Sequence, residues 1–388
     1  MRFEFATATR IIFGPGTIQE VAPLAAGLGD RAFVVTGRTA KRAKLLLERL
    51  TKQGIECVTF NVPGEPTTTL VAEGVKQARQ AKSEMVISIG GGSVLDTGKV
   101  IAALLTNSGE LEDYLEVVGL GKSLTQAPVP HIAIPTTAGT GAEVTRNAVI
   151  AVPEHKVKVS VRSPLILPRL AVVDPVLTHS MPPSVTASTG LDALTQLIEP
   201  YVSNKANPLT DGICREGLKR AGRSLQQAYE DGSNSSARED MAMASLFSGL
   251  ALANAKLGAV HGLAGPLGGM ISAPHGVICA RLLPYVMQTN VQALQTRAPD
   301  SPALVRYDEI AKILTEKATV RAVDGVEWVK GLCTVLKLPS LDEFGWKELD
   351  FPTVVAKAKK SSSMKGNPIA LTDDELMKIL KKASKQMV

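Results

Sequence analysis

Short apolar runs alternate with amphipathic segments through roughly the first 180 of the 388 residues, and this alternation limits the possible folds more than any other feature. The runs that predict strands are residues 31–36, 56–60, 85–89 and 131–134. The segments that predict helices between them are residues 41–53, 70–81 and 93–105. Strands that alternate with helices form parallel βαβ units, and such sheets bind ligands at the carboxyl ends of their strands. The sequence therefore predicts an α/β part with a Rossmann-like parallel sheet.

The pattern becomes helical from about Pro183 onward, and 388 residues suit two domains better than one. We expect an α/β domain at residues 1–181 and an all-helical domain at residues 182–388. The first helices expected in the second domain are residues 186–202, 207–229 and 237–256.

Three smaller features complete this outline. Residues 148–151 and 156–161 predict a β-ribbon between the two domains. The last helix is expected to begin at Thr372, with a capping box closed by Glu375. The stretch KKSSSMKGNP around residue 365 predicts a solvated loop.

The charge balance and the cysteines argue against several classes of protein. The 43 basic residues exceed the 37 acidic ones, but the net charge of +6 is spread along the chain without the basic stripe of nucleic-acid-binding proteins. Four widely separated cysteines without CxxC spacing predict reduced thiols that are buried as small apolar side chains. No apolar run is long enough for a membrane span, and the N-terminus lacks a secretory signal pattern. We expect a cytoplasmic protein with no nucleic-acid or membrane partner.

Two glycine-rich turns follow predicted strands. Residues 90–93 (GGGS) come after the strand MVISI and open a helix, where glycine lets a diphosphate approach the backbone and the helix N-terminus supplies free N–H groups. Residues 135–143 (PTTAGTGAE) follow the strand HIAI, and their hydroxyl groups suit phosphate or ribose. Two such loops on one sheet indicate a dinucleotide.

A possible metal site combines Asp192, on the first long helix of the second half, with His261 and His275. One carboxylate and two imidazoles form an open three-ligand site for Zn²⁺ or Fe²⁺, which leaves room for a substrate oxygen. Only five histidines occur in the chain, and two of them lie in this one Gly- and Pro-rich segment.

Together these residues resemble the iron-containing (group III) alcohol dehydrogenases, almost from end to end. The matching motifs are FGPG from Phe13, GGGSVLDTGK from Gly90, PTTAGTGAEVT from Pro135, VDP from Val173, TGLDAL from Thr189, ANPLTD from Ala206, HGLAGPLG from His261, PHG from Pro274 and NPIALTDDEL from Asn367. Several long motifs in the right order are far more specific than a lone glycine pattern.

The resemblance implies a dehydroquinate synthase-like fold: an N-terminal nucleotide domain and a C-terminal helical domain that holds the metal and the substrate, assembled as a homodimer or larger homo-oligomer. The residues that it places at the cofactor are Gly90, Gly91, Gly92, Ser93, Asp96, Thr136, Thr137, Thr140 and Lys158. The catalytic residues that it implies are Asp192, His261 and His275.

Two positions depart from the family pattern. The family usually has a ligand histidine four residues after the aspartate, where this chain has Gln196, and a second histidine in HxxxH, where this chain has Gly265. A glutamine offers only a neutral carbonyl oxygen to a metal. We expect a site made by Asp192, His261 and His275, with Gln196 as a fourth ligand or hydrogen-bonded beside them.

The cofactor preference rests on the turn after the second strand. Family members that prefer NAD tend to have an aspartate there, whereas this chain has Gly37 followed by Arg38, Lys41 and Arg42. A missing carboxylate and nearby cations favour the 2′-phosphate of NADP, with NAD as the alternative.

The predicted activity is hydride transfer between a nicotinamide and a small aldehyde or ketone, with the metal polarising the carbonyl oxygen. Two alternatives remain. One is an enzyme similar to maleylacetate reductase that reduces an oxo acid or activated double bond. The other is a nucleotide-binding paralogue with impaired catalysis, which Gln196 and Gly265 would explain.

Overall fold

A computed structural model describes residues 2–155, 157–346 and 350–384, so Lys156 at the predicted ribbon lies outside the described residues. The chain divides into two compact units. The first, called here the α/β unit, comprises Ala6–Thr137 and Gly141–His179. The second, called the helical unit, comprises Ser180–Val388 together with Met1–Phe5 and the short piece Ala138–Thr140.

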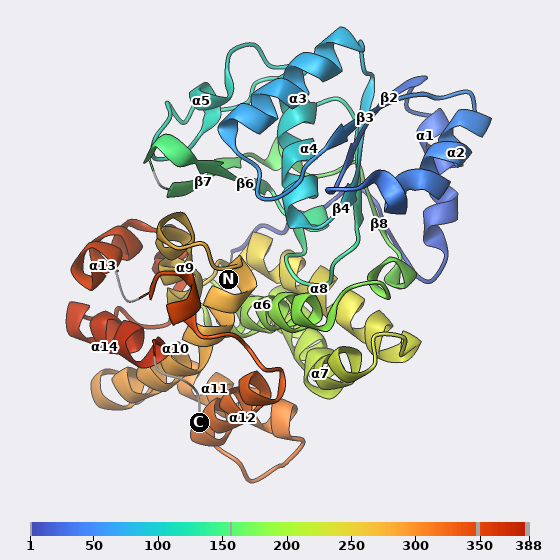
Figure 1. Ribbon diagram of the computed structural model, residues 1–388. Coiled ribbons are helices and arrows are strands. Elements are labelled where there is room, and N and C mark those ends of the chain that lie inside the picture. Colours follow the sequence, from blue (N-terminus) through green and yellow to red (C-terminus); the bar gives the residue numbers. More distant parts are fainter. Residues whose placement is uncertain (1, 156, 347–349, 385–388) are drawn as a thin grey trace. The chain divides into compact units, whose positions relative to one another are not determined.

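The α/β unit is built on a six-stranded parallel sheet (Figure 1). Its strands, in spatial order, are β1 (Ile11–Phe13), β8 (Leu170–Val173), β5 (His131–Pro135), β4 (Met85–Gly90), β2 (Arg31–Thr36) and β3 (Glu56–Asn61). Every neighbouring pair is parallel. The four predicted strands are confirmed as β2 to β5, whereas the short edge strand β1 and its partner β8 were not anticipated.

Both faces of this sheet are covered by helices, as in a doubly wound fold. The helices are α1 (Val21–Ala26), α2 (Lys44–Lys52), α3 (Thr68–Gln80) and α4 (Gly92–Leu104). Because side chains alternate along a strand, Phe33 and Val35 of β2 join the core formed with α3 and α4. Val34, between them, joins the core formed with α1 and α2. The predicted helices in this part of the chain are confirmed to within a few residues.

The carboxyl ends of the central strands lie at one level. Thr36 of β2 is level with Ile89 of β4, and Gly90 is level with Pro135 of β5. The chain runs from β2 outward to β3 and then back to β4 on the other side, so the strand order reverses between β2 and β4. This is the position at which sheets of this class bind ligands.

The predicted ribbon is confirmed as an antiparallel pair, β6 (Asn147–Val152) and β7 (Val157–Arg162). A bridge between Thr67 and Ala151 joins it to the start of α3. The remaining helix of this unit is α5 (Leu111–Tyr114).

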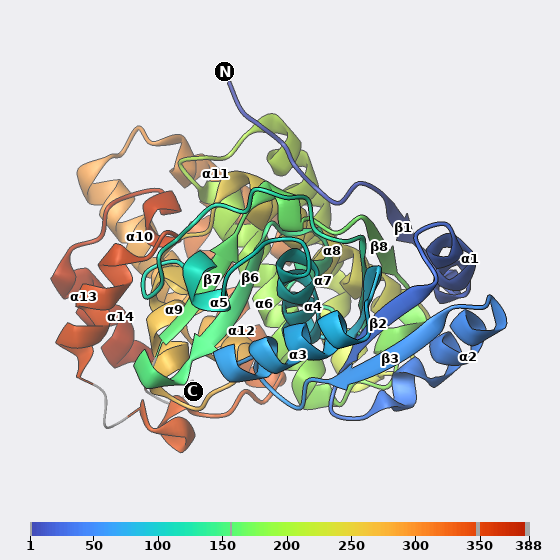
Figure 2. The ribbon, with the colours of Figure 1, turned by 90° about the horizontal axis from the view of Figure 1, so that it is seen from above.

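The helical unit consists mainly of helices, which Figure 2 shows in a second view. They pack around one large apolar core. The helices are α6 (Pro183–Val202), α7 (Pro208–Glu230), α8 (Ser235–Ala255), α9 (Ala259–Met270), α10 (His275–Arg297), α11 (Pro302–Thr315), α12 (Ala322–Val335), α13 (Phe351–Lys360) and α14 (Asp373–Ala383). Short 3-10 turns elsewhere in the chain are Thr17–Glu20, Ala40–Ala43, Ala142–Val144, Pro153–His155, Pro164–Ile166, Pro175–Thr178, Leu341–Phe344 and Met364–Gly366.

Among the described residues, no single helix combines the length and apolar character needed to cross a membrane. Only α8 and α9 taken together meet that requirement, and they are bent by 100° where they meet.

The C-terminal segment contains one confirmed prediction and one that holds only in part. Thr372 caps α14, and the Thr372 and Glu375 side chains each accept a hydrogen bond from the other residue's backbone N–H. The stretch around residue 365, however, does not end as a solvated loop. Asn367 is buried, and its amide donates to Asn290 Oδ1 at 2.8 Å and to the Ile369 carbonyl at 2.8 Å. A polar residue in a buried network looks like a loop residue in sequence because its partners are distant.

Candidate active site

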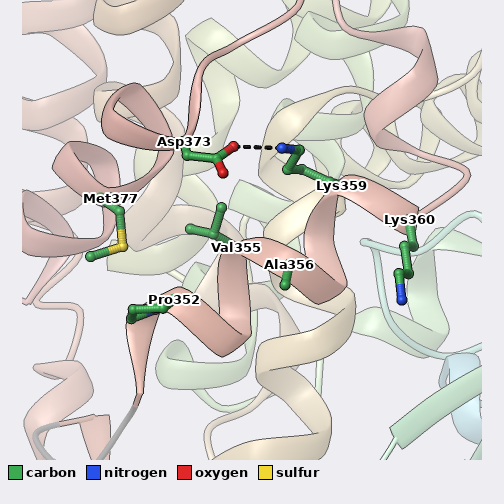
Figure 3. Close-up of a pocket in the computed structure, with 7 residues that line it drawn as sticks. All are labelled: Pro352, Val355, Ala356, Lys359, Lys360, Asp373 and Met377. Atoms are coloured by element: carbon green, nitrogen blue, oxygen red, sulfur yellow. Dashed lines mark hydrogen bonds and ion pairs between the residues drawn. The ribbon is translucent and has the colours of Figure 1, made fainter.

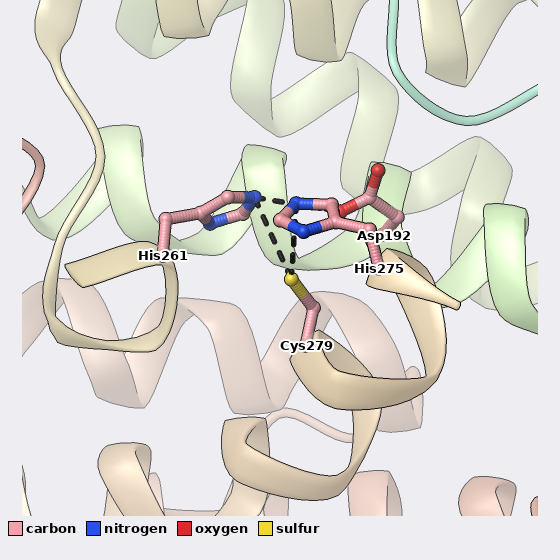
Figure 4. A group of neighbouring side chains, drawn as sticks. All are labelled: Asp192, His261, His275 and Cys279. Atoms are coloured by element: carbon pink, nitrogen blue, oxygen red, sulfur yellow. Dashed lines mark hydrogen bonds and ion pairs between the residues drawn. The ribbon is translucent and has the colours of Figure 1, made fainter. Parts of the chain in front are cut away.

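Three helices bring a carboxylate, two imidazoles and a thiol together inside the helical unit (Figure 4). Asp192 lies on α6, His261 is the third residue of α9, and His275 is the first residue of α10. Cys279 follows His275 by four residues, one helical turn further along α10, so both side chains point the same way. One donor atom from each of the four residues lies within 4.8 Å of the others.

The contacts within this cluster are close. His261 Nε2 lies 3.4 Å from Asp192 Oδ1, and His275 Nε2 lies 3.9 Å from the same oxygen. Cys279 Sγ lies 3.5 Å from His275 Nε2 and 3.7 Å from His261 Nε2. The side chains of Asp192 and His261 are 3% and 7% exposed, whereas that of His275 is 38% exposed. The cluster is therefore reached from the side of His275.

Glu199 fixes the orientation of His261. Its carboxylate Oε2 accepts a hydrogen bond from His261 Nδ1 at 2.6 Å, and its Oε1 accepts one from the Val260 backbone N–H at 2.7 Å. Because Nδ1 faces Glu199, Nε2 faces Asp192 and Cys279, and it can act as a ligand once it has lost its proton. A carboxylate behind an imidazole is the usual support for a metal-binding histidine.

Asparagine side chains complete the start of α9. Asn367 Oδ1 accepts a hydrogen bond from the Ala259 backbone N–H at 3.1 Å, and Asn290 Nδ2 donates to the same oxygen. These bonds satisfy N–H groups that a helix leaves free in its first turn. The position of His261 is thus held by residues from α6, α10 and the C-terminal segment.

One buried oxygen in the cluster makes no hydrogen bond of ordinary geometry, although it lies 3.4 Å from His261 Nε2. Asp192 Oδ1 has no hydrogen-bond donor, although it faces two imidazole nitrogens. A buried carboxylate oxygen left in this way is costly unless a cation binds it. Carboxylate oxygen and imidazole nitrogen are ligands that Zn²⁺ and Fe²⁺ accept. The residues present therefore fit a divalent metal ion.

The charges around the imidazoles support the same conclusion. Burial by itself lowers the pKa of His261, but the charges of Cys279 and Glu199 and the contact with Asp192 raise it well above its usual value. The same balance of burial against Cys279 and Asp192 raises the pKa of His275. The acidic groups thus stabilise positive charge at the centre of the cluster.

Gln196 lies against the carboxylate of Asp192. Its Nε2 donates to Asp192 Oδ2 at 3.0 Å, and its Oε1 accepts from Ser248 Oγ at 3.3 Å. The amide orientation follows from chemistry, since an ionised carboxylate only accepts hydrogen bonds. Of the two roles expected for Gln196, this arrangement corresponds to the residue that orients Asp192 from behind.

Gly276 allows α10 to approach α6 closely. A Cβ at this position would lie 2.2 Å from the Ser188 carbonyl oxygen, so only glycine fits beside His275. A Cβ at Gly265 would meet nothing within 4 Å, so the turn of α9 that follows His261 presents open space.

The predicted cofactor residues of the α/β unit gather at one edge of its sheet. Gly37 follows β2, residues 91–93 follow β4, and Thr136 and Thr137 follow β5. The Thr136 backbone N–H donates to the Gly90 carbonyl at 2.9 Å, and a Cβ on Gly91 would lie 3.3 Å from Thr137 Cγ2. Thr140, also predicted here, belongs to the piece Ala138–Thr140 that groups with the helical unit.

Asp96 is engaged by protein groups on both oxygens. Lys99 Nζ lies 3.3 Å from Asp96 Oδ1, and the Val149 backbone N–H donates to Asp96 Oδ2 at 2.9 Å. Lys99 is fully buried and also donates to Thr145 Oγ1 and the Asn147 carbonyl, each at 2.8 Å. In this structure Asp96 therefore anchors the ribbon to α4, and its role at a cofactor stays a prediction.

The charged residues predicted at the cofactor differ in their surroundings. Arg38 and Lys41 are exposed, and the guanidinium of Arg38 donates two long hydrogen bonds of 3.4 Å to the Pro63 carbonyl. Lys158 is mostly buried and donates to Glu65 at 2.6 Å. Arg38 and Lys41 thus flank the end of β2, whereas Lys158 is paired on the ribbon.

Comparison with known proteins identifies the family. Residues 8–175 match the family model described as iron-containing alcohol dehydrogenase, and residues 186–384 match the C-terminal model of the same family. The chain belongs to the iron-containing alcohol dehydrogenases. It is 37% identical over 384 residues to alcohol dehydrogenase 4 of Saccharomyces cerevisiae, with 96% of each chain covered. It is 35% identical over 396 residues to 1,3-propanediol dehydrogenase of Klebsiella pneumoniae, with 98% of each covered.

A solved structure of 1,3-propanediol oxidoreductase shares the fold of this alcohol dehydrogenase. The TM-score is 0.90 at 35% identity, with 99% of this chain and 100% of the other covered. The predicted family and fold class are therefore confirmed. The protein is an oxidoreductase that acts on CH–OH groups, and its family implies a nicotinamide nucleotide and a metal ion as cofactors.

Two residues of the dehydrogenase site were missed in the sequence. Cys279 was expected to be a small buried side chain, and it is buried, but its sulfur faces two imidazoles. Its spacing of four residues from His275 was the available signal. Glu199 lies seven residues after Asp192, on the same face of α6, and this spacing could have indicated it.

A surface hollow between α13 and α14 is a poor candidate for the active site (Figure 3). Its lining includes Pro352, Val355 and Met377, with an exposed ion pair between Lys359 and Asp373 at 2.7 Å. It contains none of the buried imidazoles or partnerless carboxylate oxygens that distinguish the Asp192 cluster.

Proposed function

We propose that this alcohol dehydrogenase transfers a hydride between the nicotinamide of NADP and the carbonyl carbon of a small aldehyde or ketone. Asp192, His261 and His275 act as the catalytic residues by holding a divalent metal ion, Fe²⁺ or Zn²⁺. The observation that carries this proposal is the buried Asp192 Oδ1, which has no hydrogen-bond donor and faces two imidazole nitrogens. The bound groups supply the hydride and the Lewis acid that polarises the carbonyl oxygen.

The protein contributes geometry to this reaction. Glu199 holds His261 with Nε2 directed into the cluster, and Gln196 holds the carboxylate of Asp192. Ligands fixed in this way lose little freedom when they bind a metal. Because His275 is the most exposed member, the substrate oxygen approaches from its side.

We assign the nucleotide to the sheet edge of residues 1–181, and the metal and substrate to residues 182–388. The residues proposed at the nucleotide are Gly37, Arg38, Lys41, Gly90, Gly91, Gly92, Ser93, Asp96, Thr136, Thr137, Thr140 and Lys158. The support is local: α4 begins at Gly92, directly after β4, and its first N–H groups lie where the strand order reverses.

The proposed preference for NADP is tested by two variants. Gly37 has open space around a Cβ and no positive φ, so Gly37→Asp adds a carboxylate without strain. We expect this variant to raise KM for NADPH about tenfold or more and to lower KM for NADH. Arg38→Ala should raise KM for NADPH and leave KM for NADH unchanged. A parent enzyme with a markedly lower KM for NADH would contradict the proposal.

The metal-assisted reaction is tested by metal analysis and kinetics together. The parent and Asp192→Ala are purified anaerobically, loaded separately with Fe²⁺ and Zn²⁺, and assayed with NADPH on aldehydes, ketones and maleylacetate. We expect near-stoichiometric metal in the parent, loss of that metal in Asp192→Ala, and a fall in kcat/KM of about a thousandfold. Equal metal content and activity in the two proteins would refute the proposal.

The same assay separates the alternatives. Turnover of maleylacetate but not of simple aldehydes would favour the oxo-acid reductase. Tight NADP binding by fully metal-loaded protein without turnover of any carbonyl compound would favour the impaired paralogue.

We further propose that the enzyme is a homodimer or larger homo-oligomer in the cytoplasm. Its four free cysteines fit a reducing compartment. Sedimentation of the purified protein at several concentrations tests the assembly, and imaging of a tagged chain in its own cell tests the location.

A further inference from the structure

The sulfur of Cys279 occupies an unusual position for a buried cysteine. Cys214 lies among apolar side chains of the helical unit, and the Cys333 thiol donates to the Ala280 carbonyl. Cys279 Sγ instead has imidazole nitrogens from two helices as its polar neighbours, at 3.5 and 3.7 Å. It faces the same space as the partnerless oxygen of Asp192.

Three of the contacts in this cluster have the length of a tetrahedral edge around a metal ion, a fourth is slightly longer, and all four ligand atoms lie within 4.8 Å of one another. Metal–nitrogen and metal–oxygen bonds of about 2.0–2.2 Å and a metal–sulfur bond of about 2.3 Å place tetrahedral ligand atoms about 3.3–3.7 Å apart. The observed separations are 3.4 Å between His261 and Asp192, 3.5 Å between Cys279 and His275, and 3.7 Å between Cys279 and His261. The fourth, between His275 and Asp192, is 3.9 Å.

Gln196 does not compete for this position in the arrangement observed. Its amide nitrogen is bound to Asp192 Oδ2, and its carbonyl oxygen accepts from Ser248 Oγ. A ligand role for Gln196 would break both bonds inside a buried environment. Cys279 needs no such change, because its sulfur already points between the two imidazoles (Figure 4).

We propose that the Cys279 thiolate is the fourth protein ligand of the metal ion, together with Asp192, His261 and His275, and that a substrate oxygen would then bind as a fifth ligand from the exposed side of His275. This inference rests on the proposed metal-binding function and specifies its ligand set. On binding, the thiol releases its proton to solvent and the sulfur donates an electron pair to the metal.

A thiolate changes which metal the site prefers. Sulfur is a soft ligand that favours Zn²⁺ over oxygen-preferring ions such as Mn²⁺ and Mg²⁺. A site made only of the two imidazoles and the carboxylate would discriminate less between Zn²⁺ and these oxygen-preferring ions. The enzyme should therefore bind Zn²⁺ tightly and also accept Co²⁺, whose spectrum reports its ligands.

The test is the absorption spectrum of the cobalt-loaded enzyme. Thiolate coordination produces a sulfur-to-cobalt charge-transfer band in the near ultraviolet, which nitrogen and oxygen ligands do not give. We expect this band in the parent, its loss in Cys279→Ser, and its retention in Cys333→Ser, which changes another buried thiol of the same unit. Competition with a chelator should show at least a hundredfold weaker Zn²⁺ binding in Cys279→Ser, roughly the upper end of what a supporting residue contributes.

X-ray absorption of the zinc-loaded parent tests the proposal without any variant. A sulfur scatterer at about 2.3 Å is expected. A shell of nitrogen and oxygen alone, or a cobalt spectrum without the charge-transfer band in stoichiometrically loaded parent, would overturn the role of Cys279. If Asp192→Ala still lost the metal in that case, the proposed function would stand and only the thiolate ligand would fall. A parent that bound no metal would overturn both.

Discussion

Two buried charge clusters, one in each unit, differ in whether their polar atoms are satisfied. In the α/β unit, Lys99 Nζ is surrounded by Asp96, Thr145 and the Asn147 carbonyl, and Asp96 receives a further bond from Val149. In the helical unit, Asp192 Oδ1 has no donor, and the atoms nearest to it are imidazole nitrogens. The first cluster is complete in itself, whereas the second leaves a position for a cation.

This difference distinguishes a structural cluster from a binding site. A saturated buried ion pair contributes to the folded state only while both partners remain, and removing one leaves an uncompensated charge. A cluster with a partnerless atom costs stability until its ligand binds, and such costs are typical of functional sites. Burial and charge alone would not separate the two clusters.

The largest expected effect is on the complete cluster. Lys99→Met removes the cation beside Asp96 and should cost about 3–5 kcal/mol, or about 10 °C in the Tm of the metal-free protein. Calorimetry on metal-free protein measures this change. Asp192→Asn, the matched change in the open cluster, should lower the same Tm by about 3 °C or less. Equal effects of the two variants would remove the distinction drawn between the clusters.

The next largest effect is on metal binding by the Asp192 cluster, and it comes from the position of the backbone at the start of α10. Gly276→Ala forces a Cβ to within 2.2 Å of the Ser188 carbonyl, so the start of α10 must move and take His275 with it. We expect Zn²⁺ affinity to fall about a hundredfold in a chelator competition. Gly331→Ala, on an open face of α12, is the control and should instead stabilise the protein by up to about 1 kcal/mol. Unchanged zinc affinity in Gly276→Ala would mean that His275 tolerates displacement.

Glu199 is not a proposed metal ligand, but it contacts the ligand His261 and so tests how far support of the ligands affects metal binding. Glu199→Gln keeps the shape of the side chain but removes the charge that supports His261, and metal affinity should fall tenfold to about a hundredfold. Glu309→Gln, which breaks a surface ion pair with Arg215, should leave the affinity unchanged. If both variants bound zinc like the parent, the contact at His261 Nδ1 would be structural only.

The smallest effect depends on pH and belongs to the α/β unit. Burial, together with the charge of Lys99, lowers the pKa of His131 to about 3. In the unfolded chain His131 becomes protonated near pH 6.5, whereas in the folded chain it stays neutral down to about pH 3. The contribution of His131 to the free energy of unfolding is therefore fully present above pH 6.5 and is lost as the pH falls toward 3.

Relative to His131→Asn, the parent should therefore lose about 1.4 kcal/mol of unfolding free energy for each pH unit below 6.5. Denaturant unfolding of both proteins at pH 7.5, 6 and 5 measures the difference. A difference that stayed constant across these pH values would show that the pKa of His131 is the same in the folded and unfolded protein.

The two units also differ in how well their candidate sites could be predicted from the sequence. The nucleotide edge depends on turns that directly follow apolar strands, so local patterns predicted residues 90–93 and the turn with Thr136 at the ends of neighbouring strands, whereas Gly37 was predicted through the family resemblance. The cluster around Asp192 depends on helices that meet only in the folded chain. Its aspartate and two histidines were predicted from their residue types and supported by a family resemblance. Glu199 and Cys279 had only a helical spacing to indicate them, and their roles became clear in the packing of α6, α9 and α10.

The segment around residue 365 departs from its prediction at Asn367 for the same physical reason. Its serines, lysines and glycine are typical of a solvated loop, but the Asn367 amide lies in a buried network with Asn290 and the first turn of α9. Local composition gives the polarity of a residue, whereas the location of its partners is a tertiary property.

The cap on α9 also sets an order of events during synthesis of the chain. Asn367 binds the backbone of Ala259 from 108 residues further along the sequence. The helix that carries His261 is therefore completed only after Asn367 has left the ribosome. A nascent chain stalled before that point would display its histidines without their final support, and the metal is expected to load after translation rather than during it.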